Sequence, residues 1–340
     1  MRALVCHEYG PIESLKLEEL APPALKPGHV RVAVRAAGVS FATILGVQGK
    51  HQNKQALPYI PGNEMSGVVL EAAADVTDLA PGDRVTGPVS SGAFAAEVVA
   101  LAANLCRMPA SMDFAAATNF PTLYPTAYGA LRWKAKLAPG EVLLVHGAGG
   151  GSGLTAVEVG KAMGATVIAT AGGADKLEVA RAHGADHLVD SRRDDIRARV
   201  LEFTGGRGAD VIYDPVGGEI FDASLRCIAV EGRLIPMGFA SGKIPQIPAN
   251  ILLVKNVTVI GFYYGYYNGW GRPGEAVDAA DVARRHGMVR AALDEMFRWF
   301  EQGKLKAHVA GNFPLADWMA AFKLIEDRKV IGKAALDPAR

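Results

Sequence analysis

The feature that most constrains the fold is a glycine-rich turn between an apolar run and a helix-like segment. Residues 142–145 read Val-Leu-Leu-Val, residues 146–153 read His-Gly-Ala-Gly-Gly-Gly-Ser-Gly, and a helical pattern then begins at Leu154. Strand, glycine turn and helix in this order form the context that the dinucleotide-binding fingerprint requires. In its closest register the fingerprint falls on Ala148, Gly150 and Gly153, with an alanine where the first glycine usually stands. We therefore expect a pyrophosphate at the helix N-terminus, where unpaired N–H groups and the helix dipole favour anions.

The alternative is a glycine turn that merely connects two elements, and the segments that follow argue against it. The runs expected as strands are 142–145, 166–170, 187–189, 211–213, 234–236 and 257–260, and the helix-length segments between them are 154–163, 176–183, 196–203 and 221–228. This alternation is typical of an α/β protein with a doubly wound parallel sheet and right-handed crossovers, the Rossmann arrangement. A longer helical pattern covers 289–301.

The first third of the chain has a different texture. Short β-type runs alternate with Pro-Gly pairs, as where residues 30–34 follow Pro27-Gly28. This pattern predicts a compact, mostly β barrel or sandwich. Since 340 residues exceed the roughly 100 to 200 of one domain, we expect two domains, one formed by 1–122 plus 266–340 and the other by 123–265.

Composition excludes several classes of protein. With 36 Lys+Arg against 35 Asp+Glu, the chain has no basic field that would collect nucleic acid or an anionic membrane. The three cysteines lie far apart and form no C-x-x-C pair, so neither a disulfide framework nor a thiolate zinc finger has support. We find neither the apolar region of a signal peptide nor a run approaching the ~18 apolar residues of a membrane helix. We expect a cytoplasmic protein with no membrane or nucleic-acid partner.

The end of the second expected strand bears on the choice of dinucleotide. An NAD site usually places an acidic residue there, about 20 residues beyond the glycines, to hold the ribose hydroxyls. The chain instead reads Ala-Thr-Ala-Gly-Gly over 169–173, and Lys176 and Arg192 follow. Two cations can flank a 2′-phosphate, so NADPH is favoured over NADH. The alternative is that both are solvated surface charges, and the nearby Asp175 argues for caution.

These features together resemble the medium-chain dehydrogenase/reductase superfamily, and within it the zinc-independent quinone oxidoreductase (zeta-crystallin-like) branch. The likeness covers nearly the whole chain and rests on residues 37–41, 61–68, 81–85 and 126–128, the glycine turn, and the closing Gly332-Lys333. Glu158 stands where this branch usually carries Gln. The resemblance implies a GroES-like, β-rich catalytic domain beside the Rossmann domain, and a homodimer formed through the strand at 257–260.

The resemblance also implies that no metal is bound. Zinc-dependent relatives place a cysteine ligand near Ser40 and a histidine ligand at Asn63, and their four-cysteine structural lobe has no counterpart here. His51 and His146 are the nearby candidates, and both are interpreted as ordinary turn or strand-end histidines. Without a Lewis acid to polarise the acceptor, hydride transfer from NADPH suits an acceptor that is already electrophilic, such as a quinone.

Site residues are assigned by the same resemblance, and no catalytic residue is assigned. The expected substrate-binding residues are Ser40, Phe41, Tyr59, Asn63 and Tyr264. The expected cofactor-binding residues, which include the glycine turn and the two cations, are Thr126, Gly149, Gly150, Gly151, Ser152, Gly172, Lys176, Arg192, Val216, Gly238, Phe239, Phe262, Tyr263 and Lys333.

Residues 262–270 hold six aromatic side chains in nine. They suit a wall of the acceptor pocket that continues into a subunit contact, or simple core packing; stacking on nucleic-acid bases would require interleaved cations. Three functions remain open: an NADPH-dependent quinone oxidoreductase, an NADPH-dependent reductase of activated carbon–carbon double bonds in enones or acyl thioesters, and a non-catalytic nucleotide- or RNA-binding protein.

Overall fold

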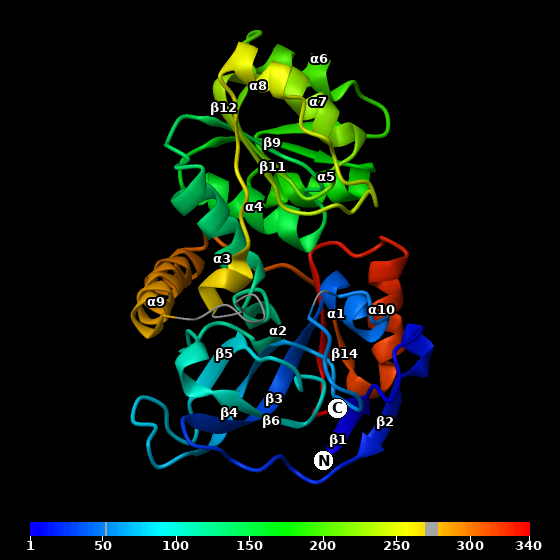
Figure 1. Cartoon of the computed structure of the whole chain (residues 1–340), viewed down its shortest axis with the longest axis vertical. Coiled ribbons are helices and arrows are strands. Elements are labelled where there is room, and N and C mark those ends of the chain that lie inside the picture. The colour runs from blue at the N-terminus through cyan, green and yellow to red at the C-terminus, as the bar shows by residue number, and fades with distance from the viewer. Residues whose placement is uncertain (52, 269–277) are drawn as a thin grey trace. The chain divides into compact units, whose positions relative to one another are not determined.

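The chain forms two compact units in the computed structural model, which describes residues 1–51, 53–268 and 278–340 (Figure 1). The first unit is Met1–Thr122 with Ala307–Arg340, and the second is Leu123–Lys306. The chain therefore passes from the first unit to the second once and returns once. The described residues 266–268 and 278–306 belong to the second unit, in which the long helix α9 (Ala279–Glu301) packs against α3 (Leu123–Tyr128). The expected domain bounds, 1–122 plus 266–340 and 123–265, stay a prediction.

The second unit contains a six-stranded parallel sheet in the order β10-β9-β8-β11-β12-β13. Its strands are β8 (Val142–Val145), β9 (Thr166–Ala171), β10 (His187–Asp190), β11 (Ala209–Asp214), β12 (Ile228–Pro236) and β13 (Thr258–Val259). The order reverses between β8 and β11, which is the switch point of a doubly wound sheet. The prediction of an α/β fold with a Rossmann domain is confirmed.

Helices cover both faces of this sheet. They are α4 (Gly151–Ala162), α5 (Ala174–Ala182), α6 (Ile196–Phe203), α7 (Glu219–Cys227) and α8 (Ala249–Lys255), of which only α8 was not expected from the sequence. Leu143 meets α4 on one face, and a Cβ added to Gly160 of that helix would lie 2.3 Å from Leu143 Cδ2. Leu144 points to the other face, in a buried cluster with Val200 of α6 and Phe221 of α7.

Helix α4 begins at Gly151, inside the glycine turn, rather than at Leu154. Likewise α9 begins at Ala279 rather than at residue 289. The remaining short helices of the second unit are η3 (Gly129–Lys134), a π-helix, and the 3-10 helix η4 (Tyr264–Asn268).

The first unit is β-rich, with a seven-stranded sheet in the order β14-β15-β3-β4-β5-β7, β6 pairing with β3, and a separate β1–β2 hairpin-like pair. The strands are β1 (Arg2–Val5), β2 (Lys16–Glu19), β3 (His29–Val39), β4 (Glu64–Ala72), β5 (Arg84–Pro88), β6 (Glu97–Leu101), β7 (Cys106–Arg107), β14 (Val309–Pro314) and β15 (Lys333–Asp337). Its helices are η1 (Ile12–Ser14), α1 (Phe41–Val47), η2 (Ala102–Asn104), α2 (Phe114–Ala117), η5 (Leu315–Asp317) and α10 (Trp318–Glu326). Because β15 pairs antiparallel with β3, the last described strand belongs to the sheet of the first unit.

The core of the first unit follows from the alternation along β3. Val30, Val32 and Val34 point inward and are buried, and they join a cluster that includes Leu336 of β15 and Phe322 of α10. Within the described parts of the chain, no helix is both long and apolar enough to cross a bilayer.

Candidate functional site

The glycine turn leaves the start of α4 open. Gly150 is the N-cap residue, in extended conformation at φ −85° and ψ 164°, and no side chain caps this end of the helix. The N–H groups of the first turn are therefore available to an anionic ligand. The turn lies at the carboxyl ends of the parallel strands, next to the switch point, where doubly wound sheets bind their ligands.

Adding a Cβ atom to each glycine tests whether the turn fits a pyrophosphate. At Gly153 the added atom would lie 2.3 Å from the carbonyl oxygen of Gly147, so this glycine is required by the packing of helix against turn. At Gly150 the nearest protein atom would be 3.5 Å away. The space beside Gly150 is thus left open by the protein, as a site for a phosphate close to backbone requires.

The two cations lie against glycines at this same edge. A Cβ on Gly149 would be 2.7 Å from Lys176 Cβ, and a Cβ on Gly172, at the end of β9, would be 2.7 Å from Arg192 Nε. The carboxylate of Asp175 lies beside Gly173, where an added Cβ would be 2.8 Å from its Oδ1. The aliphatic stem of Lys176 thus lies against Gly149, and the guanidinium of Arg192 lies against Gly172. Two cationic side chains at this edge suit an adenosine carrying a 2′-phosphate.

A second turn packs beside the glycine turn. Asp214 Oδ1, at the end of β11, accepts hydrogen bonds from the backbone N–H groups of Val216 (2.8 Å) and Gly217 (3.0 Å). A Cβ on Gly147 would lie 3.3 Å from Val216 Cγ2. The structure therefore brings Val216 to the glycine turn, as a shared role in cofactor binding requires.

Residues that follow β12 join the same edge. A Cβ on Gly238 would lie 3.3 Å from the carbonyl oxygen of Pro215, and a Cβ on Gly217 would lie 3.2 Å from Phe239 Cδ1. Gly238 and Phe239 are thus neighbours of the 215–217 turn. Ser152, in the first turn of α4, exchanges a 2.8 Å hydrogen bond with the buried hydroxyl of Tyr213.

His146, at the end of β8, is fully buried beneath the turn. Ser224 Oγ donates to the carbonyl of Ile220 at 2.8 Å, so it accepts from His146 Nε2, also at 2.8 Å, and Thr170 Oγ1 then donates to His146 Nδ1 at 2.9 Å. Burial lowers the pKa of His146 to about 4, with a smaller opposing effect from Asp214. The imidazole is therefore neutral and structural near neutral pH.

The other histidine considered as a ligand, His51, accepts a 3.1 Å hydrogen bond from the N–H of Asn53 through Nδ1. Across residues 1–51, 53–268 and 278–340, no three His, Cys, Asp or Glu side chains are grouped as metal ligands. The expectation that no metal binds stays a prediction.

In the first unit, Ser40 caps α1: its Oγ accepts from the N–H of Thr43 at 3.2 Å. Phe41 begins the helix with 58% of its surface exposed. Tyr59 pairs with Cys6 through two backbone hydrogen bonds of 2.8 and 3.0 Å, and a Cβ on Gly46 of α1 would lie 3.6 Å from its hydroxyl. Burial, and then the neighbouring Cys6 thiol, raise the pKa of that hydroxyl, so it stays protonated.

Lys333 lies in a buried ion pair. Its Nζ donates to Glu64 Oε2, and each of the two side chains is 3% exposed. Gly38 makes room for the pair, since a Cβ there would lie 2.7 Å from Lys333 Cε and 2.8 Å from the Glu64 carboxylate. Asn63 precedes Glu64, and its carbonyl accepts from the N–H of Val89 at 2.9 Å. The cofactor contact expected of Lys333 remains a prediction, and its ammonium serves the ion pair.

The aromatic segment divides into packed and exposed residues. Phe262 packs on η3, where a Cβ on Gly129 would lie 2.6 Å from its ring, and Tyr267 lies 4.9 Å from the ring of Trp133. Tyr264 is buried at 5% exposure, whereas Tyr263 is 48% exposed. Thr126 lies in α3, three residues before Gly129. Residues 269–270, which end the segment, lie outside the described residues.

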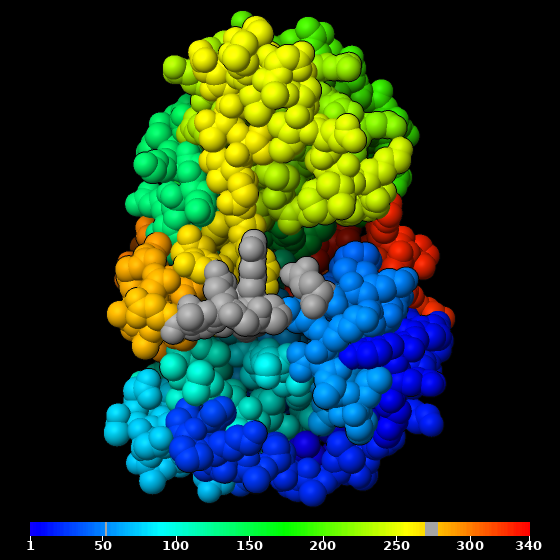
Figure 2. Space-filling model, viewed as in Figure 1, coloured from blue at the N-terminus to red at the C-terminus, as the bar shows by residue number. Residues whose placement is uncertain are grey.

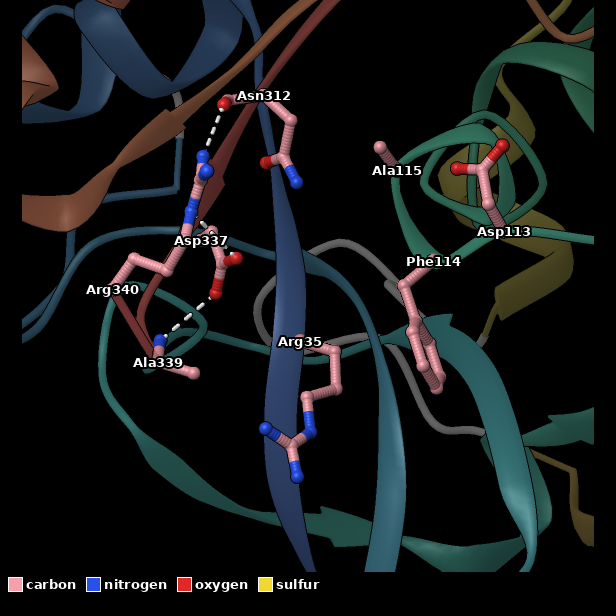
Figure 3. A pocket seen from close by; sticks show the side chains of 8 residues that line it. All are labelled: Arg35, Asp113, Phe114, Ala115, Asn312, Asp337, Ala339 and Arg340. Atoms are coloured by element: carbon pink, nitrogen blue, oxygen red, sulfur yellow. Dashed lines mark hydrogen bonds and ion pairs between the residues drawn. The ribbon is translucent and has the colours of Figure 1, made fainter.

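An open pocket of about 410 Å³ in the first unit stands apart from these residues (Figure 3). It is lined by Arg35, Asp113, Phe114, Ala115, Asn312, Asp337, Ala339 and Arg340, none of which was predicted as a site residue. Arg340 is engaged by the carboxylate of Asp337 at 3.1 Å and by the carbonyl of Asn312 at 2.8 Å. The charged side chains that line this pocket carry both signs, and Arg340 is paired with Asp337. The pocket therefore offers no distinct ligand chemistry.

The sequence did not reveal the residues whose hydrogen bonds position the candidate site residues. Asp214 and Tyr213 end an ordinary apolar strand, and no local pattern shows that they fix Val216 and Ser152. Glu158 was noted only as a departure from a family pattern, yet it binds three partners, described below.

Comparison with known proteins agrees with this geometry. The alcohol dehydrogenase GroES-like domain family matches residues 26–117, and the zinc-binding dehydrogenase family matches residues 151–280. The chain is 39% identical over 342 residues to the quinone oxidoreductase-like protein 2 homolog of Nematostella vectensis, covering 99% of this chain and 88% of that protein.

Among solved structures, the Escherichia coli quinone oxidoreductase complexed with NADPH aligns with a TM-score of 0.87 at 28% identity, covering 99% of this chain and 100% of that one. A 2-haloacrylate reductase aligns with a TM-score of 0.82 at 29% identity over the full length of both chains.

A GroES-like unit and a doubly wound unit in one chain define a medium-chain dehydrogenase/reductase, a class of oxidoreductases. Within that superfamily the chain belongs to the zinc-independent quinone oxidoreductase branch.

Proposed function

We propose that this protein is an NADPH-dependent oxidoreductase that reduces a quinone without a metal. The observation that carries the choice of NADPH is the pair Lys176 and Arg192, whose side chains lie against glycines where an NAD enzyme would place a carboxylate. The 39% identity to a quinone oxidoreductase-like protein supports a quinone as acceptor. The NADPH-complexed E. coli relative supports the same choice of cofactor.

In this proposal NADPH supplies a hydride, which together with one proton converts the quinone to a hydroquinone and leaves NADP⁺. The N–H groups at the start of α4 hold the pyrophosphate, and Val216, Gly238 and Phe239 line its path. We assign binding of the acceptor to Ser40, Phe41, Tyr59 and Asn63 of the first unit. The contribution of the protein is to orient the two reactants and exclude water.

The second candidate is reduction of an activated carbon–carbon double bond, and the likeness to a 2-haloacrylate reductase favours it. The two reactions differ only in the acceptor, so the same assay ranks them. NADPH oxidation is followed with 9,10-phenanthrenequinone, a simple benzoquinone and an enone, with NADH in place of NADPH, and with a chelator added. Quinone turnover that chelation does not alter supports the proposal; NADPH binding without turnover on any acceptor would favour the non-catalytic alternative.

Charge reversal tests the cofactor assignment. Lys176→Glu should raise the KM for NADPH by about 10- to 100-fold, because a charged hydrogen bond to phosphate contributes about 1.5–3 kcal/mol. NADH, which lacks the 2′-phosphate, should be affected far less. The control is Lys304→Glu, an exposed lysine elsewhere in the second unit. Equal effects on both cofactors would contradict the assignment of Lys176.

The proposal includes a homodimer joined at the free edge of β13. In the described part of the sheet this strand pairs only with β12, and Leu253 and Val254 of the adjoining α8 are 78% and 77% exposed. Residues around α8, yellow in Figure 2, form part of the visible surface. Large exposed apolar side chains near an open edge suit a contact between copies. Light scattering of the wild-type protein should give twice the mass of one chain. Val254→Lys should lower the measured mass toward that of one chain.

We further propose a reducing, cytoplasmic location, which the three buried free cysteines Cys6, Cys106 and Cys227 support. An RNA-binding role predicts a mobility shift that persists at moderate salt, since nonspecific phosphate binding weakens steeply with salt. We expect no such shift.

A further inference from the structure

We propose that Glu158 is a positioning residue that fastens both passages of the chain between the two units to a single point on α4. Its side chain is 2% exposed, and it lies in the second half of the helix. Oε2 accepts from the hydroxyl of Tyr124, and Oε1 accepts from His183 Nδ1 at 2.5 Å and from the backbone N–H of Lys306 at 3.0 Å. One buried carboxyl group therefore has three partners.

The partners come from the places where the chain changes units. Tyr124 follows shortly after the passage between Thr122 and Leu123, and Lys306 is the last residue before the chain returns to the first unit. Lys306 is held a second time, because its Nζ donates to the carbonyl of Ala182 at the end of α5. His183 is the C-cap residue of that helix. Two passages far apart in sequence thus share one acceptor.

Helix α4 makes this acceptor a fixed point. Gly153 allows the helix to touch the carbonyl of Gly147, and Gly160 allows it to touch Leu143 of β8; an added Cβ would lie 2.3 Å from an atom of each. A helix locked at two glycines moves only with its sheet. Glu158 lies about 12 Å along the helix from Gly150, at 1.5 Å per residue. The same rigid helix therefore presents its N-terminus to the proposed pyrophosphate and its second half to both passages.

The consequence concerns movement during turnover. Enzymes that close over a cofactor bend at a few residues that lie away from the chemistry. With Tyr124 and Lys306 both fastened to α4, bending is confined to the chain on the first-unit side of these residues. The kinetic part of this inference rests on the proposed function. The anchoring itself rests only on the contacts.

Hydrogen exchange tests the anchor without any assay of activity. In Glu158→Ala, exchange should rise by about tenfold at both passages, over residues 120–126 and 304–309, because buried donors lose their acceptor. In Tyr124→Phe it should rise over 120–126 alone. Glu158→Gln, which keeps an acceptor oxygen and the side-chain volume, should change little.

The matched control is Glu141→Ala. Glu141 is a partly buried carboxylate of the same unit that binds Arg233 at 2.7 and 2.9 Å, but it contacts neither passage. Its removal should leave exchange at both passages unchanged. A rise spread evenly through the second unit, equal in Glu158→Ala and Glu141→Ala, would overturn the anchor. If Glu158→Ala does not fold, the confined effect of Tyr124→Phe decides the question.

Kinetics then test the positioning role. In Glu158→Ala the dissociation constant for NADPH, measured by cofactor fluorescence, should stay within about threefold, while kcat falls by about tenfold and Glu158→Gln restores it. An unchanged kcat would overturn the positioning role. A wild-type protein that turns over no acceptor would contradict the proposed function instead, and the exchange result would still decide the anchor.

Discussion

Within each unit, the candidate site residues are held in place by different means. The second unit uses backbone: the glycine turn, the open start of α4, and glycines against which Lys176 and Arg192 lie. The first unit uses side chains, and Lys333 meets Glu64 across 269 residues of sequence. A site formed by the backbone of consecutive residues can be predicted from the local sequence. A site formed by side chains from distant segments cannot, because these side chains meet only after the segments have paired.

Breaking the ion pair of the first unit should give the largest effect. Lys333→Met leaves the buried Glu64 without its partner, and such a change typically lowers the free energy of unfolding by about 3–5 kcal/mol. Urea unfolding measures it. Because replacing both partners removes the uncompensated charge, Glu64→Gln combined with Lys333→Met should recover much of the loss.

The control for that comparison is the exposed pair of Lys161 with Asp186, at 2.6 Å. Lys161→Met should lower the unfolding free energy by less than about 1 kcal/mol. If Lys333→Met and Lys161→Met lower the unfolding free energy equally, the buried pair of Lys333 with Glu64 is no more important to stability than an exposed pair.

Two glycines of the turn should separate folding from binding. Gly153→Ala places a Cβ 2.3 Å from the carbonyl of Gly147 and should lower the unfolding free energy by about 1–3 kcal/mol. Gly150→Ala meets no protein atom within 3.4 Å, so stability should hold while the dissociation constant for NADPH rises about tenfold. Titration of cofactor fluorescence beside urea unfolding gives both quantities. Identical behaviour of the two variants would contradict the assignment of separate roles.

His146 gives the second unit a dependence on pH. Its pKa is lowered in the folded protein from 6.5 to about 4, so the unfolded chain takes up the proton first as pH falls. Stability is therefore full above about pH 6.5 and declines by about 1.4 kcal/mol per pH unit from there toward pH 4. His146→Gln should lack this part of the slope, whereas His7→Gln, at the surface of the first unit, should retain it. Urea unfolding at several pH values measures the slopes, and equal slopes for wild type and His146→Gln would refute the assignment.

The smallest effect is expected at the cap of α1. Ser40→Ala removes the acceptor for the N–H of Thr43 and should lower the unfolding free energy by about 1 kcal/mol, whereas Ser40→Gly should lower it by a few tenths. A larger loss would indicate that Ser40 supports more of the first unit than its helix.

The contrast between local and distant contacts also explains which elements of the fold could be predicted from the sequence. All six strands of the doubly wound sheet were predicted, because buried parallel strands form short apolar runs. The start of α4 was placed too late, since Gly151 and Gly153 have low helix propensity. Gly153 is needed in the helix because a Cβ there would lie 2.3 Å from the carbonyl oxygen of Gly147. Helix α8 escaped notice because its exposed Leu253 and Val254 blur the helical pattern.

The site divides in the same way. The glycine turn and its two cations were predicted from local sequence, and Val216, Gly238 and Phe239, assigned by resemblance, lie where the turns meet. The partners of Glu158 could not be predicted from the sequence, because Tyr124, His183 and Lys306 come together only when the unit has folded. For every assigned site residue, the contact with cofactor or acceptor remains a prediction.

The pairing of β15 with β3 has a consequence for biosynthesis. A ribosome releases residues 123–306 as one uninterrupted stretch, so the second unit can fold while the chain is still growing. The sheet of the first unit is completed later, because residues 37–39 of β3 meet β15 only when residues 333–337 emerge. Until then the edge of β3 that β15 will cover is exposed to other chains. We therefore expect nascent protein that stops before residue 333 to aggregate more readily than the full chain.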